Sequence, residues 1–422
     1  MLELNKIKNQ SEYIIHNLKK RGIDVSKKIQ SILDLDKKRI ANQQALDLIL
    51  AEGNQIAQKI GLMAKENKFD NVKKLKSRAS EIKIESKKFI EKGNLIEKEM
   101  QDLLVQIPNV PNEKVPSGKS ELDNEIILEW GDRNQEKYLL PHWELAEKYN
   151  IIDFKKGAEI TGSGFPLYKG LGAKLQRGLI NFFLDYNINA GYTEYIPPYF
   201  VNEKSAFNTG QIPDKEGMMY HIKEDNLYVI PTAEVPITNI FNNAKFSLEE
   251  LPIKCTAYSP CFRREAGSYG KDVRGLNRLH QFDKVEIVQI CEPSKSYETL
   301  ELMVKHVSEL LKLLQLEFRI VKLCGGDLGA TSALTYDFEV YAPGQKKWLE
   351  VSSVSNFETY QSNRLNLKYV DKTKKKGLCH TLNGSSLALP RIVVGILEQH
   401  QTPNGINMPK ALLEHLHFNK II

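Results

Sequence analysis

A predicted β-hairpin carries most of the residue types in this chain that could do chemistry. Its strands are Cys261–Glu265 and Leu279–Ile287, and a basic, glycine-rich loop joins them. Side chains two positions apart share one face of a strand. This rule groups Arg263 with Glu265, and Phe282 with Lys284 and Glu286. A guanidinium matches phosphate or carboxylate, a ring can stack on a base, and a carboxylate among apolar residues can hold an ammonium group. The alternative is a surface hairpin with cross-strand salt bridges.

Two later segments offer oxygen ligands and a further cation. In Trp348–Ser353 the carboxylate of Glu350 is followed by hydroxyls in an otherwise apolar strand. Such oxygen ligands suit Mg²⁺, which usually keeps water and phosphate ligands as well. In Asn383–Arg391 we expect a glycine turn and a serine cap to open a helix with Pro390 in its first turn. Arg391 would then lie near a helix N-terminus, where anions are favoured, although an ordinary capped helix with a surface arginine fits equally well.

The order of the predicted strands and helices that position these residues indicates an α+β domain on a mostly antiparallel sheet. Strands outnumber helices, and few strand–helix–strand units recur. There is no GxGxxG after a strand and no GxxxxGK[ST], so the two common nucleotide-binding folds are not indicated. The predicted strands are Tyr192–Tyr199, Leu227–Ile230, Lys254–Glu265, Leu279–Ile290, Arg319–Leu323, Thr335–Tyr341 and Lys347–Val354. The predicted helices are Trp143–Tyr149, Leu171–Ala190, Ser296–Leu314 and Leu387–Glu398.

A long helical hairpin precedes this domain. Residues 31–104 contain no proline, and their apolar positions alternate three and four residues apart, which is a heptad pattern. The one turn-like break is 66–70, and a reversal there pairs positions whose numbers sum to 135, such as Met63 with Val72. Two helices of about 35 residues form a rod of roughly 50 Å. We expect an antiparallel coiled coil that projects as an arm; a dimerisation zipper or a passive spacer is the alternative.

The charge of this hairpin suggests a polyanionic partner. The whole chain has a net charge of +6, and Asp70–Lys92 holds eight basic residues against four acidic ones. A basic excess concentrated on one element is typical of nucleic-acid binding, whereas a merely solvated helix face is the plainer interpretation. The candidate contacts are Lys73, Lys74, Lys76 and Arg78.

Composition excludes several classes of protein. The chain has 422 residues, 41% of them hydrophobic and 27% charged, which are values of a globular protein with two or three domains. No apolar run is long enough for a transmembrane helix, and the polar start lacks a signal-peptide core, so we expect no membrane contact. Five cysteines without CxxC spacing disfavour disulfides and structural zinc and fit a reducing cytoplasm. The proline-rich segment 107–124 predicts a boundary, with an arm at 1–108, a linker at 109–125 and a catalytic domain at 126–422.

Several long motifs in a fixed order resemble the seryl-tRNA synthetase family of class II aminoacyl-tRNA synthetases. The resemblance covers essentially the whole chain and makes the hairpin a tRNA-binding arm. Leu171–Pro198 is similar to the first class II motif, which ends in a dimer-interface proline. The other matching strings are TAEVP (Thr232–Pro236), PCFRREAGSYGKDVRGLNRLHQFDKVE (Pro260–Glu286), LEVSSVSN (Leu349–Asn356), HTLNGSSLALPR (His380–Arg391) and TGSGFPLYKG (Thr161–Gly170).

The resemblance implies a role for each matching residue. Arg263 would bridge the ATP α-phosphate and the amino-acid carboxylate, and Arg391 would lie on the γ-phosphate side; these two are the catalytic residues. The serine site would comprise Thr232, Ala233, Glu234, Arg263, Glu286 and Ser385. The ATP site would comprise Arg263, Arg264, Glu265, Arg274, Leu279, Phe282, Glu350, Val351, Ser352, Ser353 and Arg391, with Arg274 on the distal phosphates. Mg²⁺ would bind Glu350 and Ser353, which alternation places on opposite faces, so a bulge or strand end is needed between them.

The implied activity is ATP-dependent attachment of serine to tRNA(Ser) through a seryl-adenylate, by a cytoplasmic homodimer that could also charge tRNA(Sec). Ser386 and Pro390 replace small glycines of the third motif, and Lys271 stands where many members carry arginine. Two other interpretations remain open. One is a tRNA-binding paralogue with a dead active site, which the intact Arg263, Glu286, Glu350 and Arg391 argue against. The other is a ligase that aminoacylates a carrier protein, whose relatives lack the long arm.

Overall fold

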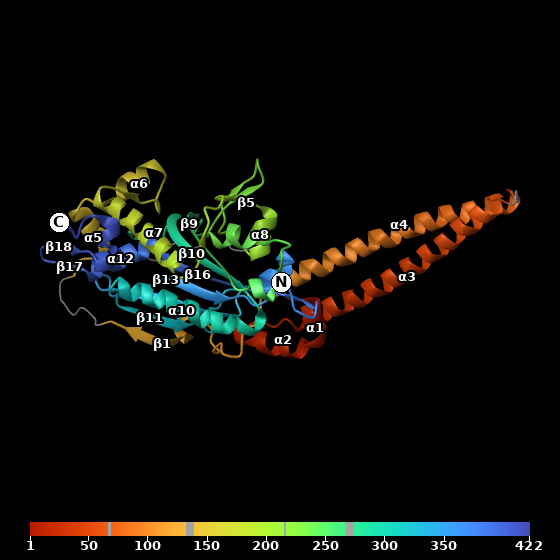
Figure 1. Cartoon of the computed structure of the whole chain (residues 1–422), viewed down its shortest axis with the longest axis horizontal. Coiled ribbons are helices and arrows are strands. Elements are labelled where there is room, and N and C mark those ends of the chain that lie inside the picture. The colour runs from red at the N-terminus through yellow and green to blue at the C-terminus, as the bar shows by residue number, and fades with distance from the viewer. Residues whose placement is uncertain (66–68, 132–138, 215–216, 267–273) are drawn as a thin grey trace. The chain divides into compact units, whose positions relative to one another are not determined.

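The chain divides into two compact units. The computed structural model describes residues 1–65, 69–131, 139–214, 217–266 and 274–422 (Figure 1). A helical unit comprises residues 2–15 and 24–108, and a sheet unit comprises residue 1 together with residues 16–23 and 109–422. Lys271 and most of the glycine-rich loop lie outside the described residues.

The helical unit is an antiparallel hairpin of two long helices (Figure 1). Helix α1 is Leu4–Asn9, α2 is Ser11–Leu18, α3 is Ser26–Lys65 and α4 is Phe69–Val105. The ends of α3 and α4 bracket the predicted reversal. Aliphatic side chains from both helices are buried along the seam, among them Leu46, Ile56, Ile82 and Ile96.

Two close approaches fix the register of this coiled coil. A Cβ atom built on Gly53 would lie 3.2 Å from Cγ2 of Ile82, and one built on Gly93 would lie 3.2 Å from Nδ2 of Asn42. In both pairs the two residue numbers sum to 135, so the predicted register is confirmed. The two glycines lower helix propensity, but each allows the facing side chain to approach closely.

Arg78 ties the two helices together through ion pairs. Its Nε lies 2.8 Å from Oε1 of Glu52 on α3, and its Nη1 lies 3.3 Å from Glu81 and 3.2 Å from Glu85 on α4. The hydrogen bond to Glu52 raises the pKa of this guanidinium above its already high usual value. Arg78 therefore stabilises the hairpin from within.

An eight-stranded sheet forms the centre of the sheet unit. Its order is β1-β11-β12-β13-β16-β10-β9-β4, and every pairing is antiparallel except β4 with β9. The strands are β1 (Glu125–Trp130), β4 (Thr193–Glu194), β9 (Ile253–Phe262), β10 (Gln281–Cys291), β11 (Phe318–Lys322), β12 (Leu334–Ala342), β13 (Lys347–Asn356) and β16 (His380–Ala388). This is the predicted α+β class with a mostly antiparallel sheet.

Three amphipathic helices pack on the sheet and complete its core. They are α7 (Leu171–Asn189), α10 (Ser296–Leu313) and α12 (Leu389–Gln399). Phe183 from α7 meets Phe318 and Phe338 from the sheet in one fully buried apolar cluster. Burying large apolar side chains in this way supplies the main stabilisation of the unit, at about 25 cal/mol per Å² removed from water.

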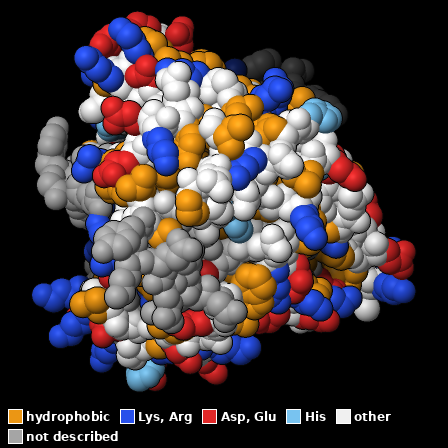
Figure 2. Space-filling view, turned by 90° about the vertical axis from the view of Figure 1, so that its left-hand side faces the viewer, with side chains coloured by type: hydrophobic (Ala, Val, Ile, Leu, Met, Phe, Trp, Pro, Cys, Tyr) orange, Lys and Arg blue, Asp and Glu red, His pale blue; other side chains and the backbone are white. Residues whose placement is uncertain are grey.

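Short elements surround this core. The small strands are β2 (Ile152–Asp153), β3 (Leu167–Tyr168), β5 (Phe200–Asn202), β6 (His221–Ile222), β7 (Leu227–Val229), β8 (Lys245–Ser247), β14 (Lys368–Val370), β15 (Lys376–Leu378), β17 (Gln401–Thr402), β18 (Gly405–Asn407) and β19 (Lys420–Ile421). The remaining helices are α5 (His142–Lys148), α6 (Phe154–Ile160), α8 (Glu203–Thr209), α9 (Glu234–Asn239), α11 (Tyr360–Leu365) and α13 (Leu413–Leu416). The face of this unit in Figure 2 intermixes acidic and basic side chains with scattered apolar ones.

The proline-rich segment after the hairpin is hydrogen-bonded along the sheet unit. The Asn109 side-chain amide donates to the carbonyls of Thr331 (2.9 Å) and Phe357 (2.8 Å). Arg21, which is buried in the same unit, donates to the carbonyls of Asn109 and Ser332. These contacts satisfy backbone groups of an irregular segment that would otherwise be buried without partners.

Two sequence-based assignments were wrong. Tyr192–Tyr199 contains only the two-residue strand β4, because Pro197-Pro198 cannot donate ladder hydrogen bonds. The predicted glycine turn and serine cap at Asn383–Ser386 belong to β16, and α12 begins only at Leu389, without a side-chain cap. Ser386 therefore lies in a strand, where its hydroxyl donates to Oδ1 of Asn187 at 3.0 Å.

All five cysteines are buried, and none is bonded to another in the structure. Among the described residues, no helix is both long enough and apolar enough to cross a membrane.

The register of the hairpin can be tested with two glycines of α3. Gly53→Ala places a methyl group against Ile82, whereas at Gly61 a new Cβ meets nothing within 4 Å. We expect Gly61→Ala to stabilise the helices by about 0.5–1 kcal/mol through propensity, and Gly53→Ala to gain less than half of that. Urea unfolding followed by helical circular dichroism measures both. Equal gains at the two positions would contradict the register.

Candidate active site

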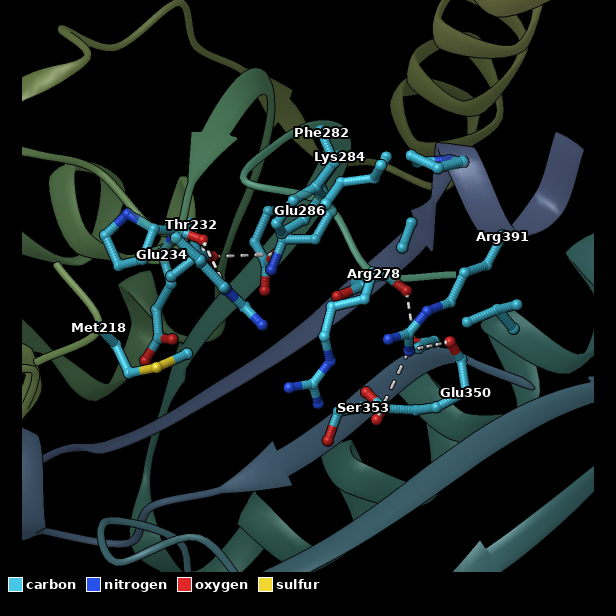
Figure 3. A pocket seen from close by; sticks show the side chains of 18 of the residues that line it. Met218, Thr232, Glu234, Arg278, Phe282, Lys284, Glu286, Glu350, Ser353 and Arg391 are labelled. Atoms are coloured by element: carbon cyan, nitrogen blue, oxygen red, sulfur yellow. Dashed lines mark hydrogen bonds and ion pairs between the residues drawn. The ribbon is translucent and has the colours of Figure 1, made fainter. Parts of the chain in front are cut away.

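One cavity gathers most of the predicted site residues. It has a volume of about 590 Å³ and lies wholly within the sheet unit (Figure 3). Strands β10, β13 and β16, helices α9 and α12 and the segment after β9 all contribute to its lining. Arg263, Glu350 and Arg391 share this cavity, as the sequence predicted.

Most of the residues predicted for the ATP and serine sites line the cavity, and three do not. Those in the lining are Thr232, Glu234, Arg263, Glu265, Leu279, Phe282, Glu286, Glu350, Val351, Ser352, Ser353, Ser385 and Arg391. Ala233 is fully buried in a separate apolar cluster, and Arg264 is exposed. The guanidinium carbon of Arg274 lies 4.5 Å from the ring centroid of Trp143, away from the lining. Lys73, Lys74, Lys76 and Arg78 belong to the helical unit.

The acidic end of the cavity depends on a β-bulge. In the pairing of β12 with β13, Phe338 faces Ser352 but Glu339 faces Glu350, so Val351 is the extra residue. The inserted residue reverses the alternation that would have separated Glu350 from Ser353. Both side chains therefore line the cavity, and the bulge expected between them is confirmed.

Oxygen ligands at this end fit a hard divalent cation. Half of the Glu350 side chain is exposed (51%), and the Ser353 hydroxyl donates to Oδ1 of Asp337 at 2.5 Å. Burial, followed by repulsion from Glu350, raises the pKa of Asp337. A cation beside Glu350 and Ser353 would relieve that repulsion, so the donor set fits Mg²⁺ with phosphate and water completing its shell.

Arg391 and Arg278 each lie beside a carboxylate of the cavity. Arg391 donates from Nη1 to the carbonyl of Glu350 at 2.5 Å and from Nε to the carbonyl of Asn277 at 3.3 Å. Its Nη1 also lies 3.8 Å from Oε2 of Glu350. Arg278 lines the same cavity, and its Nη1 lies 3.1 Å from Oε2 of Glu265. This end therefore offers two guanidinium groups to an anionic ligand.

The opposite end is built around a buried carboxylate (Figure 3). Glu286 is only 1% exposed; its Oε2 lies 2.5 Å from Nζ of Lys284 and accepts a hydrogen bond from the Thr232 hydroxyl at 3.3 Å. Burial raises the pKa of Glu286, and the ammonium group of Lys284 partly offsets that rise. This carboxylate is thus arranged to bind an ammonium group.

A second buried carboxylate adjoins the first. Glu234 accepts a hydrogen bond from Nε2 of Gln361 at 2.6 Å. Burial, followed by repulsion from Glu286, raises the pKa of Glu234 to about 7. As the pH rises through neutrality, Glu234 loses its proton and this end of the cavity gains one negative charge.

Arg263 and Phe282 also line the cavity and lie beside each other. Strand β9 ends at Phe262, so Arg263 and Glu265 follow the strand. Strand alternation therefore does not explain why both side chains line the cavity. The Arg263 guanidinium carbon lies 5.1 Å from the Phe282 ring centroid, a cation–π distance. The prediction for β10 is confirmed, because Phe282, Lys284 and Glu286 all line the cavity.

Sequence reasoning missed several residues of the site. Arg278 lies in the irregular segment before β10, where no periodic pattern predicts which way a side chain points. Gln361 lies 127 positions from Glu234, and Asp337 lies 16 positions from Ser353 on the neighbouring strand. Only strand pairing and the packing of α11 bring these partners together, so no local pattern could have identified them.

This sheet and cavity define a class II aminoacyl-tRNA synthetase core. The family model described as tRNA synthetase class II core domain (G, H, P, S and T) matches residues 219–400. The model described as Seryl-tRNA synthetase N-terminal domain matches residues 1–111.

Full-length relatives specify the family. A serine–tRNA ligase of Salinibacter ruber is 42% identical over 424 residues, covering 100% of this chain and 99% of the relative. A serine–tRNA ligase of Hydrogenobaculum sp. is 42% identical over 418 residues, covering 99% of each. The seryl-tRNA synthetase of Pyrococcus horikoshii, crystallised with ATP, matches with a TM-score of 0.92 and 33% identity over 100% of this chain and 99% of that one. This chain belongs to the seryl-tRNA synthetase family.

The raised pKa of Glu234 predicts how serine binding depends on pH. The ammonium group of serine favours an ionised neighbour, so the KM for serine should fall several-fold from pH 6 to pH 8 as Glu234 loses its proton. Glu234→Gln keeps the acceptor for Gln361 but cannot ionise, and its KM for serine should be nearly flat over that range. Steady-state pyrophosphate exchange measures both profiles. An unchanged slope in the variant would assign the titration to another group.

Proposed function

We propose that this chain uses the cavity to activate L-serine with ATP and then transfers the seryl group to tRNA(Ser). The observation that carries the proposal is the division of one cavity into a carboxylate end and a guanidinium end. Glu286 at one end fits an amino acid's ammonium group, while Arg278 and Arg391 at the other fit phosphates. Arg263, which lines the same cavity, would bridge the carboxylate of serine and the α-phosphate of ATP.

In the first step a carboxylate oxygen of serine attacks the α-phosphorus of ATP in line. A new P–O bond forms, the bond to pyrophosphate breaks, and seryl-adenylate results. No protein nucleophile is needed, so positioning and charge stabilisation supply most of the effect. Arg263 would neutralise charge at the α-phosphate, Arg391 at the γ-phosphate side, and Phe282 would stack on adenine with Glu265 and the backbone of Leu279 at its edge.

Glu350 and Ser353 would hold Mg²⁺, with Val351 and Ser352 in the same ATP-contacting run. The ion, when bound, neutralises phosphate charge. Asp337 keeps the Ser353 hydroxyl oriented through its hydrogen bond, so that an oxygen lone pair remains available.

In the second step the 3′-terminal ribose hydroxyl of the tRNA attacks the seryl carbonyl, and AMP leaves with its bonding electrons. The serine hydroxyl would be read by the polar groups at the carboxylate end, which include Thr232, Glu234 and Ser385. Alanine would leave those buried groups unpaired, a loss that can reject an analogue by about 10⁴-fold. Threonine would have to be excluded by lack of space.

The direct test is amino-acid-dependent exchange of pyrophosphate into ATP. We expect exchange with serine and at least 10³-fold less with alanine, because the polar end of the cavity is unsatisfied by a methyl group. The measurement uses the full chain and a panel of amino acids, with Arg263→Ala as the inactive control. Exchange with another amino acid but none with serine would overturn the substrate, and no exchange with any would overturn the activity.

We further propose that the helical unit, within residues 1–108, is a tRNA-binding arm and that residues 126–422 form the catalytic domain after a linker at 109–125. Lys73, Lys74 and Lys76 are exposed on α4, where they are available to tRNA phosphates. Arg78 belongs to the same predicted patch, although its guanidinium is already paired with Glu52. A cytoplasmic homodimer and an additional activity on tRNA(Sec) remain predictions from the resemblance.

The lysine patch predicts an effect confined to the tRNA step. Replacing Lys73, Lys74 and Lys76 together by glutamine should raise the KM for tRNA about tenfold or more and reduce the salt slope of tRNA binding by about 2–3, because three phosphate contacts are lost. Serine-dependent pyrophosphate exchange should not change. The matched control replaces Lys87, Lys88 and Lys92, which are equally exposed on the same helix. An equal loss in both triple variants would mean that only total charge matters.

A further inference from the structure

We infer that His142 is a positioning residue that holds the guanidinium end of the active site in place for ATP. It does so by fixing residues 274–279, which we call the return limb because they lead from the glycine-rich loop back to β10. The inference rests on the proposed function, since it assigns ATP to that end of the cavity.

His142 is completely buried at the start of α5, and both of its ring nitrogens are engaged. Nδ1 lies 2.9 Å from Oε1 of Glu398, and Nε2 accepts a hydrogen bond from the backbone N–H of Leu276 at 2.9 Å. An imidazole that accepts at Nε2 carries its proton on Nδ1, which then donates to the Glu398 carboxylate. Glu398 thereby selects the tautomer that can bind the return limb.

Glu398 is itself held by several donors. Besides Nδ1 of His142, its carboxylate accepts hydrogen bonds from the backbone N–H groups of His142 and Gly344, each at 2.9 Å, and from Nε2 of Gln345 at 2.8 Å. A fully buried carboxylate with this many donors has little freedom to move. It therefore joins α12, α5 and the turn between β12 and β13 into one rigid support.

The support reaches the cavity through the residue next to Leu276. Asn277 donates from Nδ2 to Oε1 of Gln345 at 2.7 Å, and its carbonyl accepts from Nε of Arg391 at 3.3 Å. Both Leu276 and Asn277 line the cavity. The return limb thus supplies one of the two carbonyls that orient the Arg391 guanidinium, and Glu350 supplies the other.

The neighbouring glycine shows how close the limb lies to the ring. Gly275 has φ +68°, and a Cβ atom there would lie 2.1 Å from Nε2 of His142. Only glycine allows this approach and this backbone conformation. Arg274, one residue earlier, lies over the Trp143 ring next to His142. Two consecutive residues of α5 therefore anchor three consecutive residues of the return limb.

The contact is remote from the carboxylate end of the cavity. His142 and Glu398 belong to α5 and α12 and do not line the cavity, whereas Thr232, Glu234 and Glu286 line its carboxylate end. We call the contact between His142 and the return limb the latch. Its loss should therefore raise the KM for ATP and leave the KM for serine unchanged, whereas a general loss of stability would change both.

The test compares three variants of the full chain with the wild type. His142→Leu removes both ring contacts, whereas His142→Gln offers an amide oxygen that can accept from the Leu276 N–H. Gly275→Ala disrupts the same contact from the return limb, because its methyl group would clash with Nε2 of His142. We expect the KM for ATP in serine-dependent exchange to rise about tenfold in the Leu and Ala variants, with the KM for serine within twofold and substantial rescue in the Gln variant. His306→Leu, which removes another largely buried histidine, is the matched control and should leave the KM for ATP unchanged.

Thermal unfolding and calorimetric ATP binding are measured on the same proteins. A lower melting temperature with unchanged ATP binding, or equal changes in the KM values for ATP and serine, would overturn the latch and leave His142 a structural residue. If His142→Leu does not fold, Gly275→Ala and His142→Gln decide the matter. ATP binding also reports on the latch when no amino acid supports exchange, so failure of the proposed function is distinguishable from failure of this inference.

Discussion

The buried carboxylate of Glu286 is the group around which the amino-acid end of the site is organised. A charge at 1% exposure is tolerated only with partners, and here Lys284 and Thr232 supply them. Removing Lys284 would leave an uncompensated charge in the sheet, whereas removing the Thr232 hydroxyl would cost one hydrogen bond. The same desolvation favours pairing of this carboxylate with an incoming ammonium group. The pKa of the adjacent Glu234 is raised by its own burial and by repulsion from Glu286. This electrostatic arrangement fits the ammonium group of an amino acid.

The other end of the cavity relies on backbone geometry. A one-residue bulge at Val351 turns Glu350 and Ser353 to the same side, and the carbonyls of Glu350 and Asn277 fix the Arg391 guanidinium. Fixed donors and carbonyls cost no reorganisation when phosphate charge develops. A serine–tRNA ligase needs this preorganisation because its chemistry uses no protein nucleophile.

The helical unit shows how far local pattern can go. Heptad spacing in α3 and α4 predicted the antiparallel pairing and its register, since facing positions in a coiled coil depend only on the helical repeat and the turn. The pattern could not reveal that Arg78, expected to face a polyanion, is held by Glu52 across the hairpin. A side chain's partner depends on rotamers and on the facing helix, which periodicity does not encode.

The sequence by itself determined the α+β class, the coiled coil, the order of the motifs and the grouping of Phe282, Lys284 and Glu286 on one face of β10. Each of these follows from local periodicity or from contiguous residues. Only the tertiary structure decided which distant groups meet: Asp337 with Ser353, Gln361 with Glu234, and His142 with the return limb. It also moved the start of α12 to Leu389, because β-ladder pairing with β10 overrides the turn-forming tendency of glycine and serine. Such contacts arise from strand pairing and close packing between residues 16 to 134 positions apart, where local propensity carries no information.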